Sequence, residues 1–98
     1  MTHRVILRKE AQDQRDDAAV WYEDQRRDLG DEVLDEAAST LTRIGNTPFA
    51  YAEVHRRVRS ALLRRFPFAL YFRVDSEVVS VLAVMLGSRS PTAWRIRE

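Results

Sequence analysis

The chain has 98 residues, of which 45% are hydrophobic and 32% are charged. This composition is typical of one ordinary globular domain and excludes a disordered chain. Cysteine is absent, which excludes disulfides and thiolate chemistry. The N-terminal apolar run is three residues long, too short for a signal peptide, and no later run approaches a membrane span. We therefore expect a cytoplasmic protein without a membrane partner.

Charge is divided unevenly along the chain, although the formal net charge is only +1. Residues 1–50 carry 7 basic and 11 acidic side chains, a balance of −4, whereas residues 51–98 carry 9 basic and 4 acidic ones, a balance of +5. All nine basic residues of the second half are arginine. Guanidinium groups bind carboxylates and phosphates through paired hydrogen bonds, so this half predicts an acidic protein or a phosphate backbone as partner.

The first half of the sequence predicts one strand and two helices. Residues 4–9 form the strand, and residues 13–28 and 31–44 form helices with apolar positions on one face. Gly30 and Gly45 fit the position just past each helix end. The connection is short, so the helices should form an antiparallel hairpin. Four acidic residues crowd the start of the second helix and are expected to face water: Asp31, Glu32, Asp35 and Glu36.

The second half predicts strands. Residues 49–56 are expected to be irregular, and residues 57–65, 68–74 and 78–86 to be strands. The last run is apolar on both faces, which places it in the centre of the sheet. The predicted fold is therefore a single α+β domain, residues 1–98, with the two-layer order β-α-α-β-β-β and an αα-hairpin packed on an antiparallel sheet.

Catalytic chemistry has weak support in the residue types. Cleavage of RNA needs acid and base groups as well as cations around the phosphate. His3 lies near the terminus, and His55 lies in an expected loop, so acid–base groups are scarce. We predict no metal site and no cofactor, because two distant histidines without cysteine give no ligand spacing. If the chain were a nuclease, the cations would be Arg64, Arg65, Arg73 and Arg89.

A two-layer domain of this size should leave one face of its sheet partly uncovered. The strand pattern does not decide which face meets the helices. On either choice we expect an apolar groove rimmed by arginine that binds an amphipathic helix with acidic flanks. Alternatively, the arginines only solvate an exposed sheet, and Trp94 either closes the core or contacts a target. The predicted partner-binding residues are Leu63, Arg65, Tyr71, Arg73, Val81, Met85, Arg89 and Trp94.

Five stretches in a fixed order resemble the RelE/ParE superfamily of type II toxin–antitoxin toxins. They are AVWYEDQ at residues 19–25, LGDEVLD at 29–35, VRSALLRRFPF at 58–68, VLAV at 81–84, and GSRSP at 87–91 followed by Trp94. The arginine-rich hairpin and the closing turn are more similar to the ParE branch than to the RelE branch. The resemblance covers nearly the whole chain.

The resemblance implies a toxin that a cognate antitoxin silences, with the antitoxin's C-terminal helix in the apolar groove. ParE-like toxins inhibit DNA gyrase by protein–protein contact, which is the activity we expect here. RelE-like toxins cleave mRNA on the ribosome, which is the alternative. Many relatives have His, Arg and Asp where this chain has Leu86, Ser88 and Ser90, so a third interpretation is an attenuated relative that binds its antitoxin and inhibits nothing.

Overall fold

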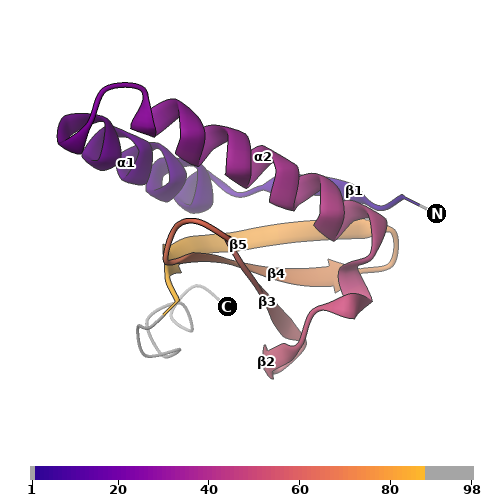
Figure 1. Ribbon diagram of the computed structural model, residues 1–98. Helices are drawn as coiled ribbons and strands as arrows, with labels where there is room; N and C mark the ends of the chain where they lie inside the picture. Colours follow the sequence, from indigo (N-terminus) through magenta and orange to yellow (C-terminus); the bar gives the residue numbers. More distant parts are fainter. Residues whose placement is uncertain (1, 88–98) are drawn as a thin grey trace.

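The computed structural model describes residues 2–87 and has two layers, with both helices on one face of a single sheet (Figure 1). The elements are β1 (Arg4–Leu7), α1 (Lys9–Gln25), α2 (Leu29–Asn46), the short 3₁₀ helix η1 (Pro48–Ala50), β2 (Glu53–His55), β3 (Val58–Leu62), β4 (Phe68–Asp75) and β5 (Val78–Leu86). The predicted α+β class and the helical hairpin on a sheet are confirmed.

The sheet has five strands in the order β1-β5-β4-β3-β2. β5 lies between β1 and β4, as its apolar character on both faces predicts. The sheet is mixed rather than antiparallel, because β1 pairs with β5 in parallel. β2 is a short additional edge strand within the segment that we expected to be irregular. Both differences arise from pairings at the edges of the sheet, which local residue patterns encode poorly.

Two glycines have a different role from the predicted one, because both lie inside α2. A Cβ at Gly30 would lie 2.6 Å from the Ala19 carbonyl oxygen, so the glycine allows α1 and α2 to approach closely. A Cβ at Gly45 would lie 3.0 Å from Val5 Cγ2, and the Gly45 carbonyl accepts a 2.7 Å hydrogen bond from the His3 N–H. These glycines therefore mark close packing within the fold rather than helix ends.

A β-bulge changes the alternation of β5. Tyr71 pairs with Ala83 and Phe72 pairs with Val81, so one extra residue of β5 lies between them. As a result Val81 and Val84 both join the helix-side core. The opposite face of the sheet has its own buried cluster, made of Val58, Ala69, Tyr71, Leu82 and Ala83.

Candidate partner-binding groove

A hollow of about 630 Å³ opens between α1 and the far ends of β4 and β5. We call it the α1–β5 groove. Its lining is mostly apolar and aromatic, with one carboxylate and one amide: Gln14, Asp17, Ala18, Trp21, Tyr22, Pro67, Phe68, Val84, Met85 and Leu86. An apolar concavity of this kind, with a few polar groups at its edge, is suited to the apolar face of a partner helix.

The groove exists because β1 is shorter than its neighbour. β1 pairs only with Val78–Val81 of β5, so the last residues of β5 extend past it. α1 covers part of this edge, where Gln14 Oε1 accepts a 2.8 Å hydrogen bond from the Val84 N–H. The remaining space between helix and strand forms the groove.

Trp21 is the exposed aromatic residue of the α1–β5 groove. Its indole ring packs edge-to-face on Tyr22, with 4.9 Å between ring centroids, and Tyr22 packs on Phe66 at the same distance. The side chain is nevertheless 57% exposed. From the sequence Trp21 is expected to pack in the core or between helix and sheet, and its exposure shows that it does not belong to the core. The available signal was its position beside, rather than on, the apolar face of α1.

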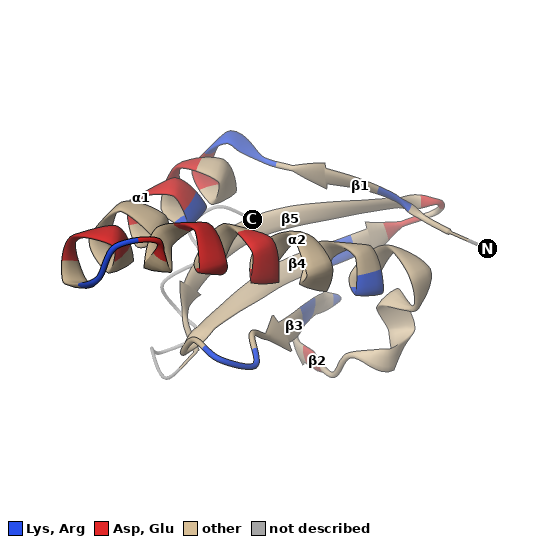
Figure 2. Cartoon of the chain, turned by 45° about the horizontal axis from the view of Figure 1, so that its top comes forward, with Lys and Arg blue, Asp and Glu red and all other residues tan. Residues whose placement is uncertain are grey.

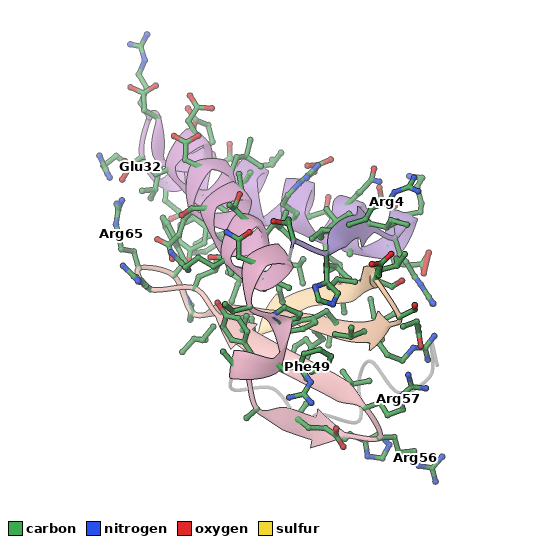
Figure 3. The ribbon with its side chains drawn as sticks, turned by 90° about the vertical axis from the view of Figure 1, so that its right-hand side faces the viewer. Arg4, Glu32, Phe49, Arg56, Arg57 and Arg65 are labelled. Carbon is green, nitrogen blue, oxygen red and sulfur yellow. The ribbon has the colours of Figure 1, made fainter. Side chains whose placement is uncertain are left out.

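The β3–β4 turn is bound to α2 by two carboxylates. Glu36 accepts hydrogen bonds from the backbone N–H groups of Arg64 and Arg65, the latter at 3.0 Å. Glu32 forms an ion pair with the Arg65 guanidinium, and this contact holds the pKa of the Glu32 carboxyl below its ordinary value. Figure 3 shows Glu32 and Arg65 pointing toward each other. The sequence predicted that Glu32 and Glu36 face water. Both instead bind the β3–β4 turn.

Six of the eight predicted partner-binding residues lie in the part of the chain that the structure describes. Met85 lines the α1–β5 groove, and it alone among these six does so. Leu63 and Val81 are buried in the helix-side core, and Tyr71 is buried in the opposite cluster. Arg65 and Arg73 are both paired with carboxylates. The remaining two, Arg89 and Trp94, lie outside the described residues.

The predicted arginine-rimmed groove on the open sheet face needs correction. The sheet face opposite the helices is buried at its apolar centre. The apolar groove lies instead at the α1 edge, and Asp17 is the charged residue of its described lining. The groove lies where β5 extends past the end of the shorter strand β1. The alternation of residues along a strand predicts the faces of a sheet and does not predict such a difference in strand length.

The arginines proposed for a nuclease do not surround one point. Arg64 and Arg65 lie in the β3–β4 turn, beyond the pair Leu62 and Ala69. Arg73 lies four residues further along β4 than Ala69, or about 13 Å at the rise of a β-strand. Arg89 is outside the described residues. The described arginines therefore belong to two separate places, the β3–β4 turn and β4, and Arg65 and Arg73 are each paired with a carboxylate.

The described residues contain neither a cluster of metal ligands nor a membrane-spanning helix. Histidine, aspartate and glutamate side chains form no group of three there that could hold a metal ion. Neither α1 nor α2 has the length and apolar character needed to cross a membrane.

Comparisons with known proteins agree with the fold. Toxin ParE2 of Mycobacterium tuberculosis, in two strains, is 29% identical over 94 residues, which cover 95% of this chain and 90% of the relative. A chromosomal ParDE toxin–antitoxin system from P. aeruginosa contains a chain of similar structure, with a TM-score of 0.77, 16% identity, and coverage of 87% of this chain and 96% of that one. The toxin–antitoxin complex RelBE2 from Mycobacterium tuberculosis gives a TM-score of 0.56, 16% identity, and coverage of 88% and 99%. No family model matches the sequence.

The chain has two helices on one face of a five-stranded mixed sheet. Its similarity to these two structures shows that this is a RelE/ParE-like fold. The similarity to ParE2 extends along nearly the whole sequence. The chain is therefore similar in sequence to a ParE2 toxin and shares the fold of the RelE/ParE-type toxin chains, which agrees with the likeness seen in the five stretches of sequence.

Proposed function

We propose that the chain is a ParE-like toxin that inhibits DNA gyrase by protein–protein contact and is neutralised by a cognate antitoxin. The observation that carries this proposal is the similarity to a ParE2 toxin over 95% of the chain. The described residues add two supporting features: an open apolar groove suited to a partner helix, and the pairing of Arg65 and Arg73 with carboxylates of the chain itself.

The antitoxin is proposed to bind the α1–β5 groove. Trp21 is an exposed aromatic residue in the lining of the groove, and aromatic anchors that become buried supply much of the energy of protein interfaces. The helix that borders the groove is acidic, with six acidic and two basic side chains in Lys9–Gln25. We therefore expect apolar residues on the antitoxin helix opposite Trp21 and a basic or polar residue opposite Asp17, in place of the acidic flanks expected from the sequence.

Tyr71 is poorly suited to be the general base of an RNase. Burial raises the pKa of the Tyr71 phenol, and a hydrogen bond with Ser60 lowers it in part. A phenol with a raised pKa stays protonated at neutral pH and is a poor general base.

The proposed activity can be tested with plasmid supercoiling by purified gyrase, with the chain added in increasing amounts. We expect loss of supercoiling and trapped DNA breaks, both reversed by the antitoxin. Unchanged supercoiling at saturating chain would reject gyrase as the target. Codon-positioned cuts of mRNA in a translating extract would instead support the ribosome-dependent nuclease. Normal growth after induction without antitoxin would indicate the attenuated relative.

The proposed antitoxin site can be tested with Trp21→Ala. Loss of a central aromatic contact should weaken antitoxin binding by about tenfold or more, measured by calorimetry. Phe49→Ala is the matched control, because Phe49 is as exposed as Trp21 and does not line this groove. Equal affinities of the two variants would place the antitoxin elsewhere.

A further inference from the structure

The turn between β2 and β3 is strained at two successive arginines. Arg56 has φ 30° and Arg57 has φ 68°, both in the region that favours glycine. Two-residue hairpin turns with positive φ usually contain Asn-Gly or Gly-Gly, because side chains with a Cβ are disfavoured there. Strained residues that persist in a fold are concentrated at functional sites, so this turn is a candidate for one.

The same turn carries excess positive charge. Arg57 donates hydrogen bonds to the Val74 carbonyl at 3.1 Å and to Asp75 Oδ1 at 2.9 Å. Asp75 also binds Arg73 at 3.2 Å, so one carboxylate serves two guanidinium groups. Arg56 forms no ion pair with any other described residue, and Figure 3 shows it pointing away from the rest of the chain. The hairpin therefore presents a net cationic tip.

An exposed aromatic ring lies beside this tip. Phe49 is 63% exposed, and it borders a hollow of about 300 Å³ together with Glu53, Arg57, Arg59, Val74 and Ser76. The Arg59 guanidinium lies 5.1 Å from the centre of the Phe49 ring and donates a 2.6 Å hydrogen bond to the Tyr51 carbonyl. Arg59 thus holds the ring in place while leaving much of it in solvent. Nearby on β2, Val54 is 43% exposed.

A protein fits this surface better than a nucleic acid does. A base would need an open face of the Phe49 ring on which to stack. Arg59 already lies over that ring, and His3 packs against it edge-to-face at 6.0 Å. Exposed apolar side chains between arginines are instead typical of protein interfaces.

We propose that Phe49, Val54, Arg56 and Arg57, the hairpin surface, bind an acidic segment of the protein that this toxin inhibits. The inference rests on the proposed function, since it names the surface that meets the target. The hairpin surface adjoins the end of β4 at Arg73, whereas the α1–β5 groove adjoins its beginning at Phe68. Figure 2 shows the contrast in charge between the acidic helices and the arginines of the sheet. Target and antitoxin therefore meet different residues.

The test compares Arg56→Glu and Phe49→Ser with Arg27→Glu, which makes the same charge change at an exposed arginine of the α1–α2 connection. Growth after induction without antitoxin reports toxicity whatever the target is. Because both substitutions remove interface contacts, we expect Arg56→Glu and Phe49→Ser each to need about tenfold or more inducer than the original chain for the same inhibition of growth. Arg27→Glu should remain toxic. Antitoxin affinity within about twofold of the original chain, for all three variants, shows that the fold and the groove are intact.

The outcomes separate this inference from the proposed target. Full toxicity of Arg56→Glu and Phe49→Ser would overturn the hairpin surface even if gyrase is inhibited. Toxicity that depends on both residues, with gyrase unaffected, would support the surface and reject gyrase. Loss of toxicity together with loss of binding to a single-stranded oligonucleotide in these variants would overturn a protein partner in favour of a nucleic acid. An original chain that inhibits neither growth nor gyrase would overturn both proposals.

Discussion

The two turns that flank β3 each contain paired arginines, and the structure uses these two pairs differently. At the β3–β4 turn, Glu32 and Glu36 of α2 bind the Arg65 side chain and the backbone of both Arg64 and Arg65. At the β2–β3 turn, Arg56 extends into solvent with no described ion-pair partner (Figure 3). The same residue pair can therefore support the architecture or remain available to a partner. Which of these applies depends on the carboxylates that other elements bring within reach.

Each turn also has a neighbouring phenylalanine, which is buried at the β3–β4 turn and exposed beside the β2–β3 turn. Phe66, in the β3–β4 turn, is 6% exposed and packs on Tyr22. Phe49, beside the β2–β3 turn, is mostly exposed and is held by Arg59. We therefore expect substitutions in the first turn to lower the free energy of unfolding and substitutions in the second to change binding.

The largest difference in the free energy of unfolding is expected between alanine substitutions of the two phenylalanines. Phe66→Ala removes a buried aromatic side chain and should lower the free energy of unfolding by about 3–5 kcal/mol. Phe49→Ala removes an exposed ring and should cost less than about 1 kcal/mol. Urea denaturation followed by circular dichroism measures both. Similar losses for the two variants would contradict the division between the turns.

Glu36 tests the architectural turn itself. Glu36→Ala removes the acceptor of the Arg64 and Arg65 N–H groups, and because these hydrogen bonds are exposed and water can replace the acceptor, the loss should be about 0.5–1.5 kcal/mol. Asp35→Ala is the matched control, since Asp35 is an exposed neighbour on the same helix. If the control loses as much stability as Glu36→Ala, the loss reflects the charge of α2 rather than the bound turn.

The strained turn should respond in the opposite direction. Arg56→Gly relieves the strain of a positive φ, which should stabilise the fold by about 1 kcal/mol. Glycine also gives the unfolded chain more conformational freedom, which should lower the stability by a similar or smaller amount. We expect stability to be unchanged or raised by up to about 1 kcal/mol. Arg27→Gly, at a position without positive φ, should be neutral or destabilising. A clear loss of stability on Arg56→Gly would show that the Arg56 side chain has a structural role.

The smallest expected effect concerns the ion pair between Glu32 and Arg65. Because the contact lowers the pKa of Glu32, its stabilisation is complete above the ordinary carboxyl pKa of 4.5 and is lost as the pH falls through the lowered value. The difference in melting temperature between the original chain and Glu32→Gln should therefore be small at neutral pH and vanish in acid. A difference that stays constant with pH would assign the effect to packing. Both side chains are partly exposed, so the effect is modest.

The fold was largely predictable because its strongest patterns are local. The i, i+3, i+4 spacing of residues 31–44 lies within α2, and the apolar run of residues 78–86 matches β5, Val78–Leu86. The residues of the proposed antitoxin groove were predicted less well. Met85 lines the α1–β5 groove, but Leu63 and Val81 belong to the core, and Trp21 was assigned to it wrongly. Burial depends on which elements pack together, and the period of a strand does not contain that information.

The sequence by itself determined the two helices, the order of the main strands and the likeness to ParE-type toxins, because these depend on periodicity and on short stretches of residues. Tertiary structure alone decided that β1 pairs in parallel with β5, that Gly30 and Gly45 serve close packing, and that a groove opens past the end of β1. It also decided which arginines α2 holds. The physical reason is that ion pairs, close contacts and strand edges join residues far apart in the chain, and their energies exist only after the elements have packed.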